Sequence, residues 1–152
     1  MAQADISFDY PDRSPGFLLW QVTNLWQKIQ RKALSELNLT HVQCALLAGI
    51  GFLENRKETV NQAALSKHVG ADVMMTSQVI RTLETKGLVQ RERGISDPRA
   101  FSLSLTEKGR ALSAEALKIV EQVDGRFFDC INKHKRNLVD VLNSLKVNEN
   151  GI

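Results

Sequence analysis

The chain has 152 residues, 43% of them hydrophobic and 24% charged, a composition that favours one water-soluble domain with a core of useful size. It contains no run of 18 apolar residues, which excludes a membrane-spanning helix, and its start lacks the apolar core of a secretion signal, so we expect a cytoplasmic protein. The formal net charge of +3 is too small to identify a partner.

The first predicted element is an N-terminal arm, residues 1–14, which shows no hydrophobic periodicity. A helix should begin at Ser14-Pro15, because serine is a good N-cap and proline suits the first helical position. Apolar residues at spacings of three and four extend this helix to about Leu37, a length of about 33 Å. The resulting apolar stripe consists of Leu18, Val22, Leu25, Ile29 and Ala33.

Three shorter helices are predicted next. Thr40-x-x-Gln43 has the form of a capping box and starts a largely apolar, buried helix. Asn61 can cap a helix over residues 62–69, and Asp72 can cap another that ends at Gly87. The last two helices are separated by three residues that include a glycine, which is the spacing of a helix-turn-helix.

A β-hairpin and two more helices complete the chain. Residues 88–93 and 100–105 alternate like strands on either side of a turn that contains Pro98. Thr106 can cap a long helix with two interleaved apolar stripes, and residues 138–145 form a last amphipathic helix. Two stripes predict two buried faces, more than a small domain needs. The stripes are Leu112, Ala116, Ile119, Val123 and Cys130, and Leu117, Val120, Phe127 and Ile131.

The helix that Asp72 caps is the first candidate for a functional surface. A helix fits the major groove of DNA, and its N-terminal, outward residues then meet base edges. Gln78 can pair with adenine, Arg81 can reach guanine or phosphate, and Val73 or Met74 can pack on a thymine methyl group. The alternative is a solvated helix face with no partner. The residues we expect to contact DNA are Val73, Met74, Thr76, Ser77, Gln78 and Arg81.

The hairpin supplies a second set of candidates. Arg91, Arg93 and Arg99 place guanidinium groups where they suit a narrow, electronegative minor groove. Asp97 repels phosphate unless a hairpin arginine pairs with it, and Asp97-Pro98 is also an ordinary turn sequence. Acidic residues are interspersed among the basic ones, so a solvated surface without a partner is the other interpretation. The basic residues of this region are Arg81, Lys86, Arg91, Arg93, Arg99, Lys108 and Arg110.

At these residues the chain resembles the multiple-antibiotic-resistance regulator (MarR) family. The resemblance covers roughly residues 15–146, and LTHVQ (39–43) and LETKGLVQR (83–91) resemble further parts of the family pattern. It implies a mainly α fold with a small β-wing: residues 38–105 as a winged helix-turn-helix DNA-binding lobe, and residues 15–37 and 106–147 as a helical dimerisation region. The residues that match the family's wing are Arg91, Asp97, Arg99, Leu105, Thr106 and Gly109.

The resemblance also implies roles for individual residues. The fourth helix would read bases, Arg99 would enter the minor groove, and Asp97 and Arg91 would orient the wing. Pro98 departs from the family pattern, where many relatives carry a basic residue. Many members respond to small aromatic or phenolic ligands held between the dimerisation helices and the DNA lobe. The corresponding candidates are Trp20, Asn24, His41 and Cys44.

The two cysteines, Cys44 and Cys130, are expected to be free buried thiols, since they lie in apolar helical segments without a secretion signal. No CxxC spacing or histidine cluster indicates a metal or another cofactor. No nucleophile–base pair or phosphate loop indicates an enzyme. The preferred hypothesis is a repressor that binds a pseudo-palindromic operator as a homodimer and is released by a small aromatic ligand. A winged-helix module that binds protein is the alternative.

Overall fold

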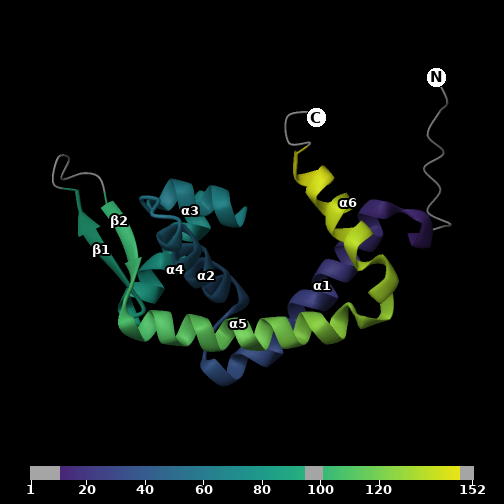
Figure 1. Ribbon diagram of the computed structural model, residues 1–152, viewed down its shortest axis with the longest axis horizontal. Helices are drawn as coiled ribbons and strands as arrows, with labels where there is room; N and C mark the ends of the chain where they lie inside the picture. The colour runs from purple at the N-terminus through teal and green to yellow at the C-terminus, as the bar shows by residue number, and fades with distance from the viewer. Residues whose placement is uncertain (1–10, 95–100, 148–152) are drawn as a thin grey trace.

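The computed structural model describes residues 11–94 and 101–147, which contain six α-helices and two strands (Figure 1). Short 3-10 helices cover Pro11–Arg13, Ser35–Leu37 and Asp129–His134. This order confirms the predicted fold class, mainly α with a small β-hairpin. The elements are α1 (Pro15–Leu34), α2 (His41–Asn55), α3 (Gln62–Val69), α4 (Val73–Thr85), β1 (Val89–Arg93), β2 (Phe101–Leu105), α5 (Glu107–Phe127) and α6 (Lys135–Val147).

Helix α5 runs along one side of the molecule and joins its two ends (Figure 1). At one end α2, α3, α4 and the β1–β2 hairpin form a lobe; at the other lie the start of α1 and α6. The hydrophobic core is inside the lobe, because the apolar stripes of its helices face one another. Its fully buried side chains include Leu46, Leu47, Ile50, Leu65, Ile80 and Leu83.

The predicted helix starts are confirmed by their caps. At α2, Thr40 Oγ1 accepts from Gln43 N at 3.2 Å, and Gln43 Oε1 accepts from Thr40 N at 3.1 Å, so the capping box is complete. A side-chain oxygen also caps each of four other helices, which satisfies backbone donors that the helix leaves unpaired. These caps are Ser14, Asn61, Asp72 and Thr106.

The β-hairpin, called the wing below, is antiparallel and pairs Val89 with Leu105 and Arg93 with Phe101. Its inner strand β2 also receives support from the other side, since Leu103 N donates to Val60 O at 2.7 Å. The buried side chains of Val89, Leu103 and Leu105 seat the base of the wing on the core of the lobe.

The end of the long helix differs from the prediction. Helix α5 ends at Phe127, and the backbone then turns through a 3-10 helix in which Ile131 has non-helical angles (φ −111°, ψ 23°). Cys130 lies in this corner and is exposed, so the prediction of a buried thiol is wrong for Cys130 and correct for Cys44. The apolar spacing continues through the corner and therefore conceals the break.

Much of the apolar surface at the α1/α6 end is uncovered in a single chain. On α1, Val22 is 47% and Leu25 is 53% exposed, and on α6 Leu145 is 58% exposed. No residue of α6 is buried. In residues 11–94 and 101–147, no helix combines the length and the apolar character needed to cross a bilayer.

Candidate nucleic-acid interface

Helix α4 presents one continuous outer face. Met74 is 76% exposed, Gln78 and Arg81 are exposed, and Ser77 is half-buried. Their positions differ by three or four residues, which places them on one side of a helix. Val73, 56% exposed, lies beside them at the N-terminal end. The structure thus brings together five of the six residues predicted on this helix.

The prediction that Thr76 faces outward is wrong. Its side chain is fully buried, and its Oγ1 donates to Asp72 O at 2.8 Å. The reason is the helical register: Thr76, Ile80 and Leu83 are spaced four and three apart and form the stripe that faces the core. The Thr76 hydroxyl is compatible with this buried position because the backbone carbonyl one turn earlier accepts its hydrogen bond.

Two side chains fix the start of α4. Asp72 Oδ1 accepts from Met75 N at 3.0 Å, and Gln62 Nε2, on α3, donates to Val73 O at 3.3 Å. Gly70 has φ 72°, a left-handed conformation that suits glycine and ends α3 sharply. The sequence indicated the cap and the glycine but gave no signal for Gln62, which joins the two helices across the turn.

The wing arginines have different surroundings. Arg91 Nε lies 3.1 Å from Glu84 Oε1 of α4, close enough for an ion pair, although the two groups are not aligned as a hydrogen bond. Arg93 is exposed near the end of β1. Asp97 and Arg99 lie outside the described residues.

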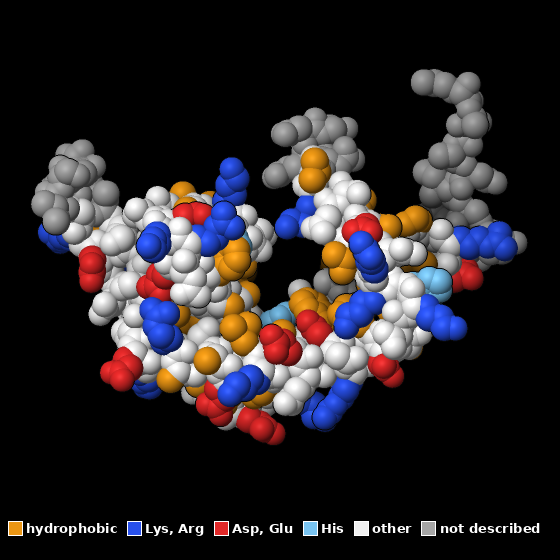
Figure 2. Space-filling view, in the orientation of Figure 1, with side chains coloured by type: hydrophobic (Ala, Val, Ile, Leu, Met, Phe, Trp, Pro, Cys, Tyr) orange, Lys and Arg blue, Asp and Glu red, His pale blue; other side chains and the backbone are white. Residues whose placement is uncertain are grey.

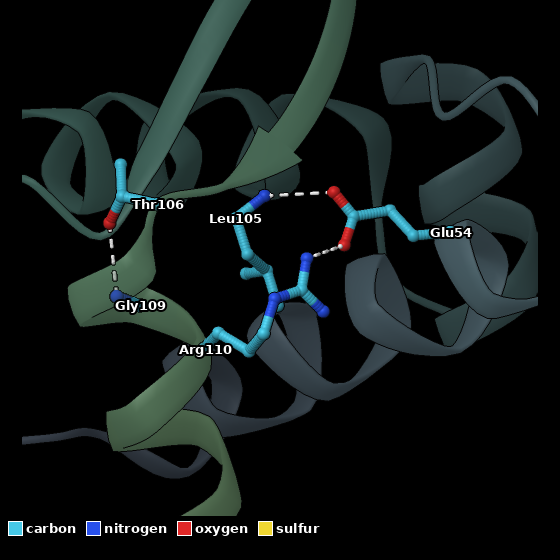
Figure 3. A network of polar contacts seen from close by, with 5 residues as sticks. All are labelled: Glu54, Leu105, Thr106, Gly109 and Arg110. Carbon is cyan, nitrogen blue, oxygen red and sulfur yellow. Dashed lines mark hydrogen bonds and ion pairs between the residues drawn. The ribbon is translucent and has the colours of Figure 1, made fainter.

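The base of the wing is fastened to α2 and α5 by a polar network (Figure 3). Glu54 Oε1 accepts from Leu105 N at 3.0 Å, and Glu54 Oε2 lies 2.7 Å from Arg110 Nη2. Thr106 caps α5 by accepting from Gly109 N, and its hydroxyl donates to Gly87 O at 2.7 Å. Glu54 belongs to the last turn of α2, from which it reaches both elements.

The four predicted ligand contacts do not form one cluster in the single chain. Trp20 is 67% exposed and Asn24 is exposed on α1, His41 is half-buried, and Cys44 is buried on α2. Burial raises the pKa of the Cys44 thiol, which keeps it protonated and unreactive.

His41 instead contacts Trp26, the other tryptophan of α1. Their rings meet edge to face with centroids 4.8 Å apart. Trp26 Nε1 and Gln30 Nε2 both donate to Asp124 Oδ1 of α5, at 2.7 and 2.8 Å. Burial lowers the pKa of His41; Asp124 opposes this shift and Arg31 adds to it. The network joins α1, α2 and α5 where the lobe meets the long helix.

A pocket of about 640 Å³ opens between α2, α3 and α5. It faces the hollow between the lobe and α6, where hydrophobic side chains gather on both walls (Figure 2). Phe52 and His68 stack almost in parallel at its edge, with centroids 4.7 Å apart, and Ala48 and Leu117 are among its apolar walls. This pocket was not predicted from the sequence; small residues on one face of α2, such as Ala48 and Gly51, were the available signal.

Comparison with known proteins supports one assignment. The family profile described as "Transcriptional regulator SarA/Rot" matches residues 28–116. The HTH-type transcriptional regulator YdcH of Bacillus subtilis (strain 168) is 44% identical over 142 residues, covering 93% of this chain and 96% of YdcH.

Two solved structures are also similar. CouR from Rhodococcus jostii RHA1, bound to p-coumaroyl-CoA, has a TM-score of 0.77 and 29% identity and covers 89% of this chain and 93% of its own. The MarR family protein Rv2887 of Mycobacterium tuberculosis, in complex with salicylic acid, has a TM-score of 0.67 and 28% identity. The match covers 87% of this chain and 96% of the Rv2887 chain.

The matches to YdcH and CouR extend over about nine-tenths of the chain, and the profile match over residues 28–116 includes the helix-turn-helix and the wing described above. They are to transcriptional regulators, a class without enzymatic activity. The chain is therefore a DNA-binding transcriptional regulator and belongs to the MarR family of winged-helix proteins, in the group that the SarA/Rot profile describes.

Proposed function

We propose that the protein is a repressor that binds a pseudo-palindromic operator as a homodimer. The observation that carries this proposal is the outer face of α4, where Met74, Ser77, Gln78 and Arg81 are accessible and no acidic side chain follows Asp72 until Glu84. Phosphates therefore meet no repulsion along the part of the helix that would enter the major groove.

The homodimer is supported by the uncovered apolar faces of α1 and α6. Contiguous exposed apolar surface marks a protein interface, and a second copy covers it with a two-fold axis. In this arrangement residues 15–37 and 106–147 form the dimerisation region, and residues 38–105 form the DNA-binding lobe. The two α4 helices then meet successive major grooves, about 34 Å apart.

The wing is proposed to lie along the minor groove. Arg93 and Arg99 supply positive charge there, while Arg91, already close to Glu84, orients the wing together with Asp97. The single tip arginine next to Pro98 makes Arg99 the main minor-groove contact.

The test begins with selection of bound sequences from random DNA. We expect a palindromic consensus whose affinity falls steeply with salt. Gln78→Ala or Arg81→Ala should change the preferred base at a contacted position and cost about 1–3 kcal/mol of binding free energy. Arg93→Ala should instead weaken binding to all sequences by the same factor. Lys118→Ala, exposed on α5 on the side away from its apolar stripes, is the charge control. A dimer that enriches no palindromic sequence at low salt would contradict the proposal. DNA affinity that does not change with salt concentration would favour the protein-binding alternative.

A small aromatic acid is the proposed effector, supported by the 640 Å³ pocket and by the salicylic acid bound to Rv2887. The p-coumaroyl-CoA bound to CouR is larger and shares only the aromatic ring with such an acid. The alternative position is the one predicted from the sequence, at Trp20, Asn24, His41 and Cys44, which do not form one cluster in the single chain. Salicylate should lower operator affinity of the native protein, and Ala48→Phe, which fills the pocket, should bind operator but no longer respond. If Ala48→Phe still loses operator affinity with salicylate as the native protein does, the ligand binds at the alternative position. If aromatic acids do not change the operator affinity of the native protein, the proposed effector is refuted.

A further inference from the structure

One face of the wing extends beyond the hydrophobic core. Cross-strand pairing places Val89, Arg91 and Arg93 of β1 opposite Leu105, Leu103 and Phe101 of β2, so these six side chains share a face. Val89, Leu103 and Leu105 are buried, whereas Phe101 is 39% exposed. The core therefore supports the base of the wing, and other contacts must support its outer part.

Within residues 11–94 and 101–147, those contacts come from one acidic residue, Glu84, and one ring, Phe101. Glu84, in the last turn of α4, lies 3.1 Å from Arg91, and the two side chains are only 28% and 29% exposed. The Arg91 guanidinium carbon lies 5.5 Å from the centroid of the Phe101 ring, and that of Arg93 lies 5.9 Å from it, both within the range of a cation–π interaction. Arg91 thus joins the recognition-helix candidate to the wing through Glu84 on one side and Phe101 on the other.

We propose that Glu84 and Phe101 are positioning residues that set the angle between α4 and the wing. This inference rests on the proposed function, in which α4 and the wing contact adjacent grooves of one operator at the same time. A two-stranded hairpin is weakly stable by itself. If the outer part of the wing moves relative to α4 in the free protein, it must become ordered when both elements contact their grooves at the same time. This ordering costs binding free energy.

A purely electrostatic role for Glu84 predicts the opposite effect. An acidic side chain near phosphate repels DNA, so its neutralisation would then tighten binding to every sequence. Loss of positioning weakens binding to the operator and leaves non-specific binding unchanged. Glu92 lies on the opposite face of β1, is exposed, and provides the matched control for the loss of one negative charge from the same region.

The experiment compares E84Q, F101L, F101Y and E92Q in the full-length protein, using the selected operator and a scrambled duplex. We expect E84Q and F101L each to weaken operator binding about threefold to fivefold, as fits a partly sheltered ion pair or cation–π contact, with scrambled-duplex binding unchanged. F101Y keeps the ring and should match the native protein, and E92Q should bind equally well or slightly better. E84Q binding as tightly as E92Q, or F101Y weakened as much as F101L, would overturn the proposal.

A second readout needs no DNA. Hydrogen–deuterium exchange of the wing peptides should be faster in E84Q and F101L than in F101Y and E92Q, with an unchanged thermal midpoint. If the native protein prefers no operator, the proposed function fails while this measurement still tests the positioning contact. Equal exchange rates in all four variants would reject the positioning contact itself.

Discussion

Gly109→Ala is expected to prevent stable folding. A Cβ at Gly109 would lie 1.9 Å from Leu88 O and 2.8 Å from Leu88 C, and both are backbone atoms. Leu88 O is held in place because it accepts from Thr106 N at 3.1 Å, and Gly109 N is bonded to the Thr106 cap. Neither segment can move without loss of the junction between wing and α5. We expect a loss of more than about 3 kcal/mol, a large part of a typical domain's stability.

Chemical denaturation followed by circular dichroism measures this loss. Gly125→Ala is the matched control, because the same helix leaves open space around a Cβ at that position. This control should be stabilised by about 0.5–1 kcal/mol, the usual gain when alanine replaces glycine within a helix. If Gly109→Ala unfolds at the same denaturant concentration as the native protein, the junction is less tightly packed than the structure indicates.

Leu25→Glu is expected to abolish the dimer and, with it, operator binding. Leu25 is 53% exposed on the apolar stripe of α1, and in the proposed dimer a glutamate there would bury an unpaired charge. The monomer would contact one half-site, so we expect operator affinity to fall by at least about 100-fold, the cost of losing a second linked contact. Sedimentation equilibrium and operator titration measure the two effects.

Arg31→Glu, exposed on the side of the same helix that lies away from the apolar stripe, is the control and should remain dimeric. A native protein that is monomeric at micromolar concentration would refute the homodimer. A Leu25→Glu protein that stays dimeric would place the interface away from this stripe.

Helix boundaries were predictable because their signals are local. Ser14, Thr40, Asn61, Asp72 and Thr106 each cap a helix within three residues of their own position. The same locality explains the failure at Cys130, where the apolar spacing continues across a change of backbone direction. Spacing records which residues are apolar, but it does not record where a helix axis turns.

The candidate interface was predictable in part. Exposure on α4 follows from helical periodicity. The one error is Thr76, which lies on the core-facing stripe, where a backbone carbonyl accepts from its hydroxyl. The different surroundings of Arg91 and Arg93 were not predictable. Glu84 is seven residues from Arg91 along the chain, and Phe101 reaches both arginines only through the strand pairing.

The sequence by itself determined the starts of the five capped helices, the turn between α3 and α4, the β-hairpin and the family, since these depend on contacts between near neighbours and on a motif of fixed spacing. The last helix, α6, begins at Lys135, three residues before the predicted start. Only the tertiary structure decided which polar side chains meet across elements: Glu54 with Arg110, Trp26 with Asp124, and Glu84 with Arg91. These partners are 56, 98 and 7 residues apart. Their meeting depends on how α2, α4, α5 and the wing pack together, which no local pattern encodes.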